Sequence, residues 1–184
     1  MLVWQNLIVT FVAATLLIGA ETTTSVSIKG VHLCCGSCSD SAEAALEGLK
    51  GITKAGTDRN TKLIAFQAAT KEDAIAALKS LAKEGFYGAA TFGKDELKWP
   101  DSGAKKGQKV PTVVIENVHL CCGACVTGAK EALEKLASAD EIDIDRNAAI
   151  ITVKGKEMDE ADVIAALNKG GFYGKVKREE KKKK

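Results

Sequence analysis

The chain has 184 residues, of which 46% are hydrophobic and 27% charged, and its formal net charge is +2. This composition is that of a globular protein with room for one medium or two small domains, and it excludes an intrinsically disordered chain. The last ten residues are strongly basic but contain no aromatic residue. We therefore interpret residues 179–184 as a solvated basic tail and expect no nucleic-acid partner.

The N-terminal segment is apolar. Residues 1–20 carry no charged side chain, and the apolar stretch 7–20 ends just before Glu21. We predict that residues 1–20 are a secretory signal peptide, with an uncleaved membrane anchor as the alternative because a span of this length can just cross a bilayer. Both interpretations place the rest of the chain outside the cytoplasm, as an exported, periplasmic or secreted protein.

The rest of the chain is a repeat of one unit. The sequence Asp-Arg-Asn at 58–60 recurs at 145–147, and Gly-Phe-Tyr-Gly at 85–88 recurs at 171–174. A polar, lysine-containing stretch separates the two copies and is typical of a linker. The predicted organisation is a first domain at 25–93, a linker at 94–110 and a second domain at 111–178.

Strand and helix patterns alternate within each unit. In the first unit, a strand around 26–31 precedes a helix that starts at the last cysteine, and two short strands flank the Asp-Arg-Asn turn. A second amphipathic helix covers 74–81, and a last short strand follows Gly-Phe-Tyr-Gly. The matching positions of the second unit repeat this order. The sequence therefore predicts an α+β protein of two tandem ferredoxin-like βαββαβ domains, each an antiparallel four-stranded sheet covered on one face by two helices.

All six cysteines and both histidines lie in two near-identical segments, Val-His-Leu-Cys-Cys-Gly-Ser-Cys at 31–38 and Val-His-Leu-Cys-Cys-Gly-Ala-Cys at 118–125. Each segment joins a predicted strand to a helix, so the two sulfurs of its Cys-x-x-Cys can face one point. The first turn of a helix also favours the thiolate form. Thiolates are preferred ligands of Cu(I) and Zn(II). The predicted metal ligands are Cys35 and Cys38 in the first unit, and Cys122 and Cys125 in the second.

These motifs resemble the heavy-metal-associated domain of copper chaperones, metal-pumping P-type ATPases and periplasmic mercury-binding proteins, whose signature is Gly-Met-x-Cys-x-x-Cys. On this resemblance the two Cys-x-x-Cys pairs stand at the metal-ligating positions, and Phe86 and Phe172 stand at a later aromatic position. The resemblance implies a non-enzymatic protein that captures or transfers Cu(I), Zn(II), Cd(II) or Hg(II). It further implies one ion per domain, with Cu(I) or Zn(II) foremost. Expected partners are a metal-transporting membrane protein or another metallochaperone, and the expected state is a monomer or a metal-bridged dimer.

The chain departs from this signature at two positions of each unit that precede the cysteines. Leu33 and Leu120 replace the usual methionine, which packs beneath the loop, and leucine can fill that space. His32 and His119 replace the usual glycine. Because each histidine alternates with apolar neighbours on an extended segment, we expect both to point toward solvent rather than to bind metal.

The third departure is a thiol directly before each pair, at Cys34 and Cys121. Cu(I) is satisfied by two thiolates, whereas Zn(II), Cd(II) and Hg(II) use three or more. Cys34 and Cys121 are therefore candidate third ligands that widen the choice of metal. The alternative is that they point elsewhere, because neighbours on an extended segment face opposite sides.

Two other functions remain open. A thiol-disulfide oxidoreductase also carries Cys-x-x-Cys at a helix start, although proteins of that kind resemble one another in a cis-proline facing the disulfide. The only prolines here, Pro100 and Pro111, lie in or beside the linker. A second alternative is a structural zinc or iron–sulfur site shared by the cysteines of both domains, which the linker permits but does not require.

Overall fold

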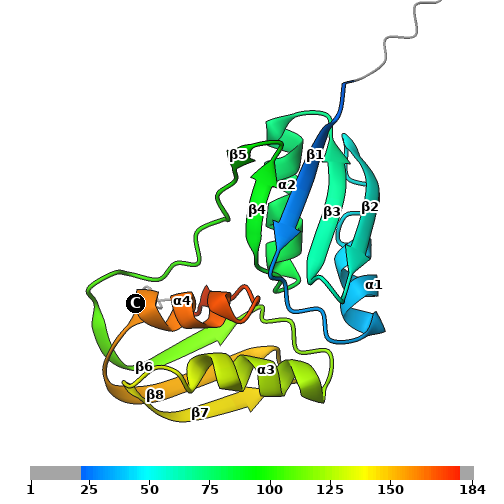
Figure 1. Ribbon diagram of the computed structural model, residues 1–184. Helices are drawn as coiled ribbons and strands as arrows, with labels where there is room; N and C mark the ends of the chain where they lie inside the picture. Colours follow the sequence, from blue (N-terminus) through cyan, green and yellow to red (C-terminus); the bar gives the residue numbers. More distant parts are fainter. Residues whose placement is uncertain (1–21, 179–184) are drawn as a thin grey trace, which may run out of the picture.

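A computed structural model describes residues 22–178 of the chain (Figure 1). The predicted signal peptide or anchor at 1–20 and the basic tail at 179–184 lie outside the described residues. Within the described range, no helix combines the length and the apolar character needed to cross a bilayer.

The first βαββαβ unit forms an antiparallel sheet with the strand order β2-β3-β1-β4-β5. Its elements are β1 (Thr24–Lys29), α1 (Gly36–Ala44), β2 (Ile52–Asp58), β3 (Leu63–Ala68), α2 (Lys71–Lys83), β4 (Ala89–Phe92) and β5 (Asp95–Glu96). The order of the first four strands is that of the ferredoxin-like arrangement. The fold-class prediction is confirmed, and this sheet has one edge strand more than predicted, since the two residues of β5 pair with β4.

The second unit repeats the arrangement with the strand order β7-β8-β6-β9. Its elements are β6 (Lys109–Glu116), α3 (Gly123–Leu133), β7 (Ala139–Asp145), β8 (Ile150–Asp159), α4 (Glu160–Lys169) and β9 (Lys175–Val176). All of its strand pairs are antiparallel. Figure 1 shows this unit, coloured green to red, below the first one.

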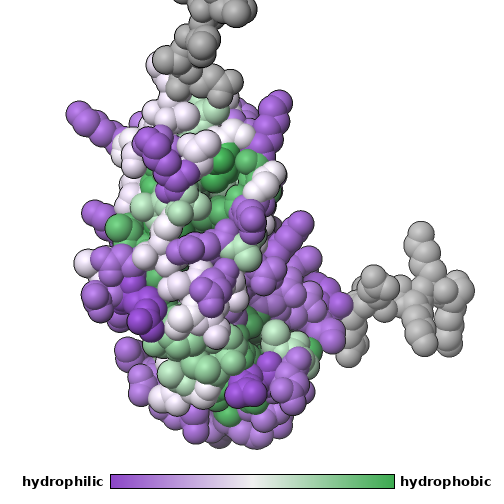
Figure 2. Space-filling view, turned by 90° about the vertical axis from the view of Figure 1, so that its right-hand side faces the viewer, coloured by the Kyte–Doolittle hydropathy of each residue, from purple (hydrophilic) through white to green (hydrophobic). Residues whose placement is uncertain are grey.

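Alternating burial along the strands explains how each sheet forms one side of a core. In β3, Ile64 and Phe66 are buried and alternate with partly exposed neighbours, as expected when one face of a sheet packs against helices. The helix α2 begins at the capping residue Thr70, whose side chain accepts a hydrogen bond from the backbone N–H of Asp73 at 3.1 Å. Figure 2 shows hydrophilic side chains over much of one face of the molecule, with hydrophobic areas between them.

The turn between β2 and β3 is fixed by the side chain of its first residue, Asp58. Asp58 Oδ1 accepts the backbone N–H of Asn60 at 2.8 Å. Asp145 Oδ1 accepts the N–H of Asn147 at 2.9 Å in the second unit. These local bonds satisfy the turn, and no ligand is needed to explain the Asp-Arg-Asn repeats.

The connection between the two units is held by side chains on both sides. The indole N–H of Trp99 donates to the carbonyl oxygen of Gly88 in the first unit at 2.7 Å. Tyr173 of the second unit donates its hydroxyl hydrogen to the carbonyl oxygen of Asp101 at 3.1 Å. Further along, the backbone N–H of Lys105 donates to a carboxylate oxygen of Glu160 at 2.9 Å. The connection therefore fixes the two units relative to each other.

The two Gly-Phe-Tyr-Gly loops meet in reciprocal contacts. Phe86 and Phe172 form an isolated antiparallel bridge. The N–H of Tyr173 donates to the carbonyl oxygen of Gly85 at 2.8 Å, and the N–H of Tyr87 donates to that of Gly171 at 3.2 Å. These contacts join loops from opposite units. As a result, the two cysteine segments are turned toward each other.

Only glycine fits at the points of closest approach in this contact. Gly85 and Gly171 have φ of +81° and +86°, in the left-handed region that favours glycine. A Cβ on Gly171 would lie 2.5 Å from the carbonyl oxygen of Gly30 and against the backbone nitrogen of His32, both in the other unit. The sequence thus allows the two loops to dock backbone to backbone.

Candidate metal centre

Each cysteine segment leads from a strand into the first turn of a helix. Cys35 is the N-cap of α1 (φ −146°, ψ 175°), and Cys122 is the N-cap of α3 with almost the same conformation (φ −148°, ψ 174°). The helices begin directly after these caps, two residues before the predicted start at Cys38 and Cys125. The four sulfurs of the two Cys-x-x-Cys pairs are therefore placed at helix N-termini, where the free N–H groups and the helix dipole stabilise a thiolate.

Apolar packing beneath the loops fixes their shape. Leu33 and Leu120 are each 5% exposed, and both belong to the buried core. Leucine thus fills the space that the sequence analysis assigned to it. Cys38 and Cys125 are completely buried in the same core. The inner cysteine of each pair has little freedom to move away from the site.

The six sulfur atoms form one continuous cluster at the junction of the two units. Nine pairs of Sγ atoms lie 3.5 to 3.8 Å apart, and five of these pairs join cysteines from different units. All six cysteines are free, because a disulfide requires about 2.05 Å between sulfurs. The candidate ligands of both units are therefore brought together, whereas the sequence analysis assigned each Cys-x-x-Cys pair to its own ion.

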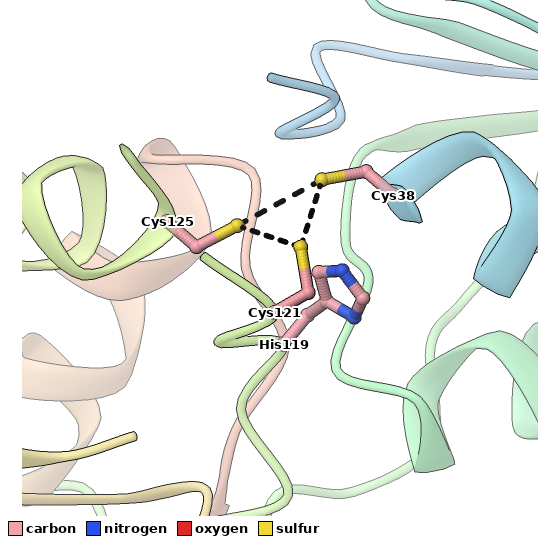
Figure 3. A group of neighbouring side chains, drawn as sticks. All are labelled: Cys38, His119, Cys121 and Cys125. Carbon is pink, nitrogen blue, oxygen red and sulfur yellow. Dashed lines mark hydrogen bonds between the residues drawn. The ribbon is translucent and has the colours of Figure 1, made fainter. Parts of the chain in front are cut away.

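Figure 3 shows one triangle of this cluster together with a histidine. Cys38 comes from α1, Cys125 from α3, and Cys121 from the loop before α3. Their Sγ atoms are 3.5 Å (Cys38 to Cys121), 3.5 Å (Cys121 to Cys125) and 3.7 Å (Cys38 to Cys125) apart. A ring nitrogen of His119 lies within 4.8 Å of all three. Three sulfurs and one nitrogen at this spacing are a ligand set that Zn(II) accepts.

The prediction that both histidines point toward solvent is wrong. His119 is 8% exposed and stacks on Phe86 of the other unit, with ring centroids 4.3 Å apart. His32 stacks on Phe172 at the same distance. The docked loops cover both rings, and this contact is not visible in the alternation of one strand.

The hydrogen bond of His119 determines which ring nitrogen is available to a metal. Nδ1 lies 3.2 Å from the carbonyl oxygen of Glu84, and a carbonyl can only accept, so Nδ1 carries the hydrogen. Nε2 is then unprotonated, and it is buried without a hydrogen-bond partner in residues 22–178. Burial lowers the pKa of His119. It also lowers the pKa of His32 to about 4, with smaller contributions from Lys62 and His119. Both rings are therefore neutral at pH 7.

The N-cap cysteines are the acidic thiols of the cluster. The backbone N–H of Cys38 donates to Cys35 and lowers the pKa of that thiol to about 6. The equivalent N–H of Cys125 lowers the pKa of Cys122. The backbone of each helix thus favours the thiolate form of its N-cap cysteine, and the Cys35 thiolate can take up a metal without first losing a proton to a base.

Three other thiols, Cys34, Cys121 and Cys125, have the opposite tendency. Burial is the largest cause that raises the pKa of Cys34, Cys121 and Cys125. Neighbouring thiols raise the pKa of Cys34 further. In the metal-free protein these groups therefore keep their protons at pH 7. A cation in the cluster would reverse this balance, because metal ions bind the deprotonated sulfur.

Comparison with known proteins gives similarity in structure but not in sequence. No protein-family model matches the chain, and no curated protein matches it. Among solved structures, the N-terminal soluble domains of Bacillus subtilis CopA are 17% identical, with a TM-score of 0.33, over 85% of this chain and 95% of theirs. The apo heavy-metal-associated domain of the copper chaperone for superoxide dismutase is 17% identical, with a TM-score of 0.34, over 48% of this chain and 85% of its own.

A third solved structure, described under crosstalk between Cu(I) and Zn(II) homeostasis, is 15% identical with a TM-score of 0.34 over 36% of this chain and 99% of its own. The chain is similar to heavy-metal-associated domains. At these identities and TM-scores, the ferredoxin-like assignment rests on the strand order of the chain's own two sheets.

All six cysteines are recognisable as candidate ligands from the sequence, but the way in which the two units combine them is not. The sequence leaves open a site shared by both units, and the docked loops bring the thiols of such a site together. The signal that could have indicated docking was the repeated Gly-Phe-Tyr-Gly, because a glycine before a large apolar residue in both copies is typical of close backbone approach.

Proposed function

We propose that this chain captures soft metal ions in the thiol cluster between its two units and passes them on by ligand exchange. The observation that carries the proposal is the contact of six free thiols at 3.5 to 3.8 Å, two of which have a lowered pKa. Free thiols gathered at this density, without disulfides, suit Cu(I) and Zn(II) better than they suit metal ions that prefer oxygen ligands. The protein acts as a carrier and not as an enzyme.

An access route to the cluster lies beside Cys121. Cys121 is the exposed member of the six. A shallow hollow beside it is lined by Lys83, His119 and Arg146, among other residues. Its two basic side chains outnumber its one acidic side chain, Glu84, and this positive balance favours the approach of an anionic metal–thiolate complex. An incoming thiol can add to the metal at Cys121 before the buried sulfurs release it, so transfer needs no free ion.

The partner in this function is a second protein with exposed thiols, either a metal-transporting membrane protein or another metallochaperone. The uncharged segment 1–20 supports an exported location, periplasmic or secreted, with membrane anchoring as the alternative. Sequestration of metal ions for tolerance would use the same site. Offering the loaded chain an acceptor protein distinguishes the two roles. A carrier returns its metal to a partner of similar affinity, whereas a sequestering protein retains it.

The test is an anaerobic titration of the reduced full chain with Cu(I) and Zn(II) against competing chelators, followed by native mass spectrometry. We expect tight binding of two Cu(I) ions that is abolished in the quadruple variant Cys35→Ser/Cys38→Ser/Cys122→Ser/Cys125→Ser. Ala124→Ser is the matched control, because the equivalent position of the first unit already carries Ser37. Binding no tighter than that of a short dithiol peptide would refute the proposal.

A thiol-disulfide oxidoreductase is the second candidate. The pKa of Cys35, lowered to about 6, favours it, since an accessible thiolate at neutral pH is the nucleophile of such enzymes. We expect a negligible rate of insulin disulfide reduction, because the only prolines of the chain, Pro100 and Pro111, both lie outside the cysteine segments, so neither takes the place of the proline that faces the disulfide in such enzymes. A rate comparable to that of a thioredoxin would make this the leading function.

A further inference from the structure

We propose that each Cys-x-x-Cys pair receives its third thiolate from the other unit of the chain. The first site consists of Cys35 and Cys38 with Cys121, and the second of Cys122 and Cys125 with Cys34. This assignment rests on the proposed function and adds the ligand set, the number of ions and the role of the two extra cysteines.

Several triangles of sulfurs are closed by the contacts of the cluster, including that of Figure 3, but only this division gives two closed triangles without a shared sulfur. In the first site the Sγ atoms are 3.6 Å (Cys35 to Cys38), 3.7 Å (Cys35 to Cys121) and 3.5 Å (Cys38 to Cys121) apart. These three contacts close a triangle that uses one sulfur from the opposite unit. Both ligands of the pair touch the added sulfur, so a single ion can bind all three.

The second site is the counterpart of the first. Its Sγ atoms are 3.8 Å (Cys122 to Cys125), 3.5 Å (Cys34 to Cys122) and 3.5 Å (Cys34 to Cys125) apart. The two triangles have no sulfur in common, and together they use all six thiols. The chain therefore holds two ions in two discrete sites, with neither ion competing for the other's ligands.

The extra cysteine makes more sulfur contacts with the opposite pair than with its own. Cys34 and Cys35 are neighbours on an extended segment, where successive side chains point to opposite sides. In the described part of the chain, Cys34 contacts the sulfurs of Cys38, Cys122 and Cys125 in hydrogen-bonding geometry but not that of Cys35. Cys34 thus contacts one sulfur of its own pair and both sulfurs of the opposite pair.

The size of each triangle suits a soft ion in a plane of three sulfurs. Thiolates placed about 2.3 Å from a central ion in such a plane lie about 4.0 Å from one another. The observed 3.5 to 3.8 Å thus requires each sulfur to move outward by only a few tenths of an ångström. Cu(I) accepts low coordination numbers and sulfur ligands. On binding, the three groups are present as thiolates, so any thiol protons are released and each loaded site carries two negative charges.

Docking of the two units is what delivers the third sulfur. His32, two residues before Cys34, lies against α3 at Gly128, where a Cβ would be 2.6 Å from its Cε1 atom. The backbone N–H of His32 also donates to the carbonyl oxygen of Gly171 at 3.2 Å. These contacts fix Cys34 beside the second pair, and the loop of Cys121 is held by the matching stack of His119 on Phe86.

The test removes one pair and asks which extra cysteine the other pair needs. In the full chain carrying Cys122→Ser/Cys125→Ser, we measure Cu(I) affinity by chelator competition, then add Cys121→Ser or Cys34→Ser. We expect Cys121→Ser to weaken binding by on the order of tenfold, equivalent to about 1.4 kcal/mol, and Cys34→Ser to leave it unchanged. In the reciprocal background, Cys35→Ser/Cys38→Ser, the two effects exchange.

The possible results separate this proposal from the proposed function. Dependence on the extra cysteine of the same unit, or on neither, would overturn the exchange of third ligands and leave metal binding intact. No Cu(I) binding in either background or in the unmodified chain would overturn both. X-ray absorption of the unmodified chain gives an independent check that needs no variant. Three sulfurs per copper at two copper ions per chain is the expected result, and two sulfurs, or four copper ions, would contradict it.

Discussion

The docked arrangement depends on Gly171, and its substitution by alanine gives a direct test. A Cβ at this position would lie 2.5 Å from the carbonyl oxygen of Gly30 and 2.9 Å from the carbonyl carbon of Val31. All of these neighbours belong to the first unit, while Gly171 belongs to the second. We expect Gly171→Ala to separate the units while leaving each sheet intact.

Two terms make up the expected loss of stability. Alanine at φ +86° costs roughly 1–2 kcal/mol in backbone strain, wherever the residue lies. Three backbone hydrogen bonds between the units are lost in addition. The N–H groups of His32 and Tyr87 donate to the carbonyl oxygen of Gly171, and the N–H of Tyr173 donates to that of Gly85. At about 0.5–1.5 kcal/mol each, these bonds stabilise the docked state by on the order of 2–4 kcal/mol. A change of this size increases the population of the open state by more than tenfold.

Gly48→Ala is the matched control for this variant. Gly48 has φ +71°, but no atom lies within 4 Å of its expected Cβ, so it reproduces the strain without the collision. The assays are thermal unfolding, small-angle scattering of the metal-free chain and Cu(I) affinity. Gly171→Ala should increase the radius of gyration and remove the contribution of Cys121 to the first site, whereas Gly48→Ala should lower stability alone. A compact Gly171→Ala chain with unchanged affinity would refute the argument that docking requires glycine.

Three further predictions follow from single side chains. Replacing His119 by phenylalanine keeps a ring for stacking but removes Nε2. In a competition titration, Zn(II) affinity should therefore fall at least tenfold while Cu(I) affinity stays the same. Equal losses for the two metals would contradict Nε2 as a zinc ligand. Thr70→Ala should destabilise the chain by about 1 kcal/mol in denaturant unfolding, through loss of the cap on Asp73, without changing metal affinity. Glu160→Gln should cost about 1–2 kcal/mol at pH 7 by weakening the contact with Arg178. The hydrogen bond from Arg178 lowers the pKa of Glu160, so its stabilisation is present above the ordinary value of 4.5 and is lost as the pH falls through the lower folded-state value. Unfolding curves for Glu160→Gln should therefore depend less on pH below 4.5 than those of the unmodified chain.

The fold was predictable because its information lies in local patterns. Alternation in β3 and helical spacing in α2 each bury one face, and the Asp58 side chain closes the hairpin between β2 and β3. The strand β5 was not predictable, because two residues, Asp95 and Glu96, are too few to show a period and neither is buried. That strand exists because the turn at Gly93 directs the chain back along β4.

The site was predictable only in part, since residue type is a local property and the pairing of two loops is not. Cys-x-x-Cys at a helix start indicates metal chemistry in any sequence, but nothing within 31–38 shows that a second segment lies opposite. The predicted orientation of His32 was wrong for this reason, because the pattern of one strand gives no sign of Phe172 in the other unit, on which the ring stacks. The same applies to Cys34, which contacts one sulfur of its own pair, that of Cys38, but both sulfurs of the opposite pair. The extra thiol has a structural role once a second unit docks against it, because it then contacts both sulfurs of the opposite pair. The duplication of the unit and the doubled cysteine are therefore explained together, since each copy supplies the ligand that the other lacks.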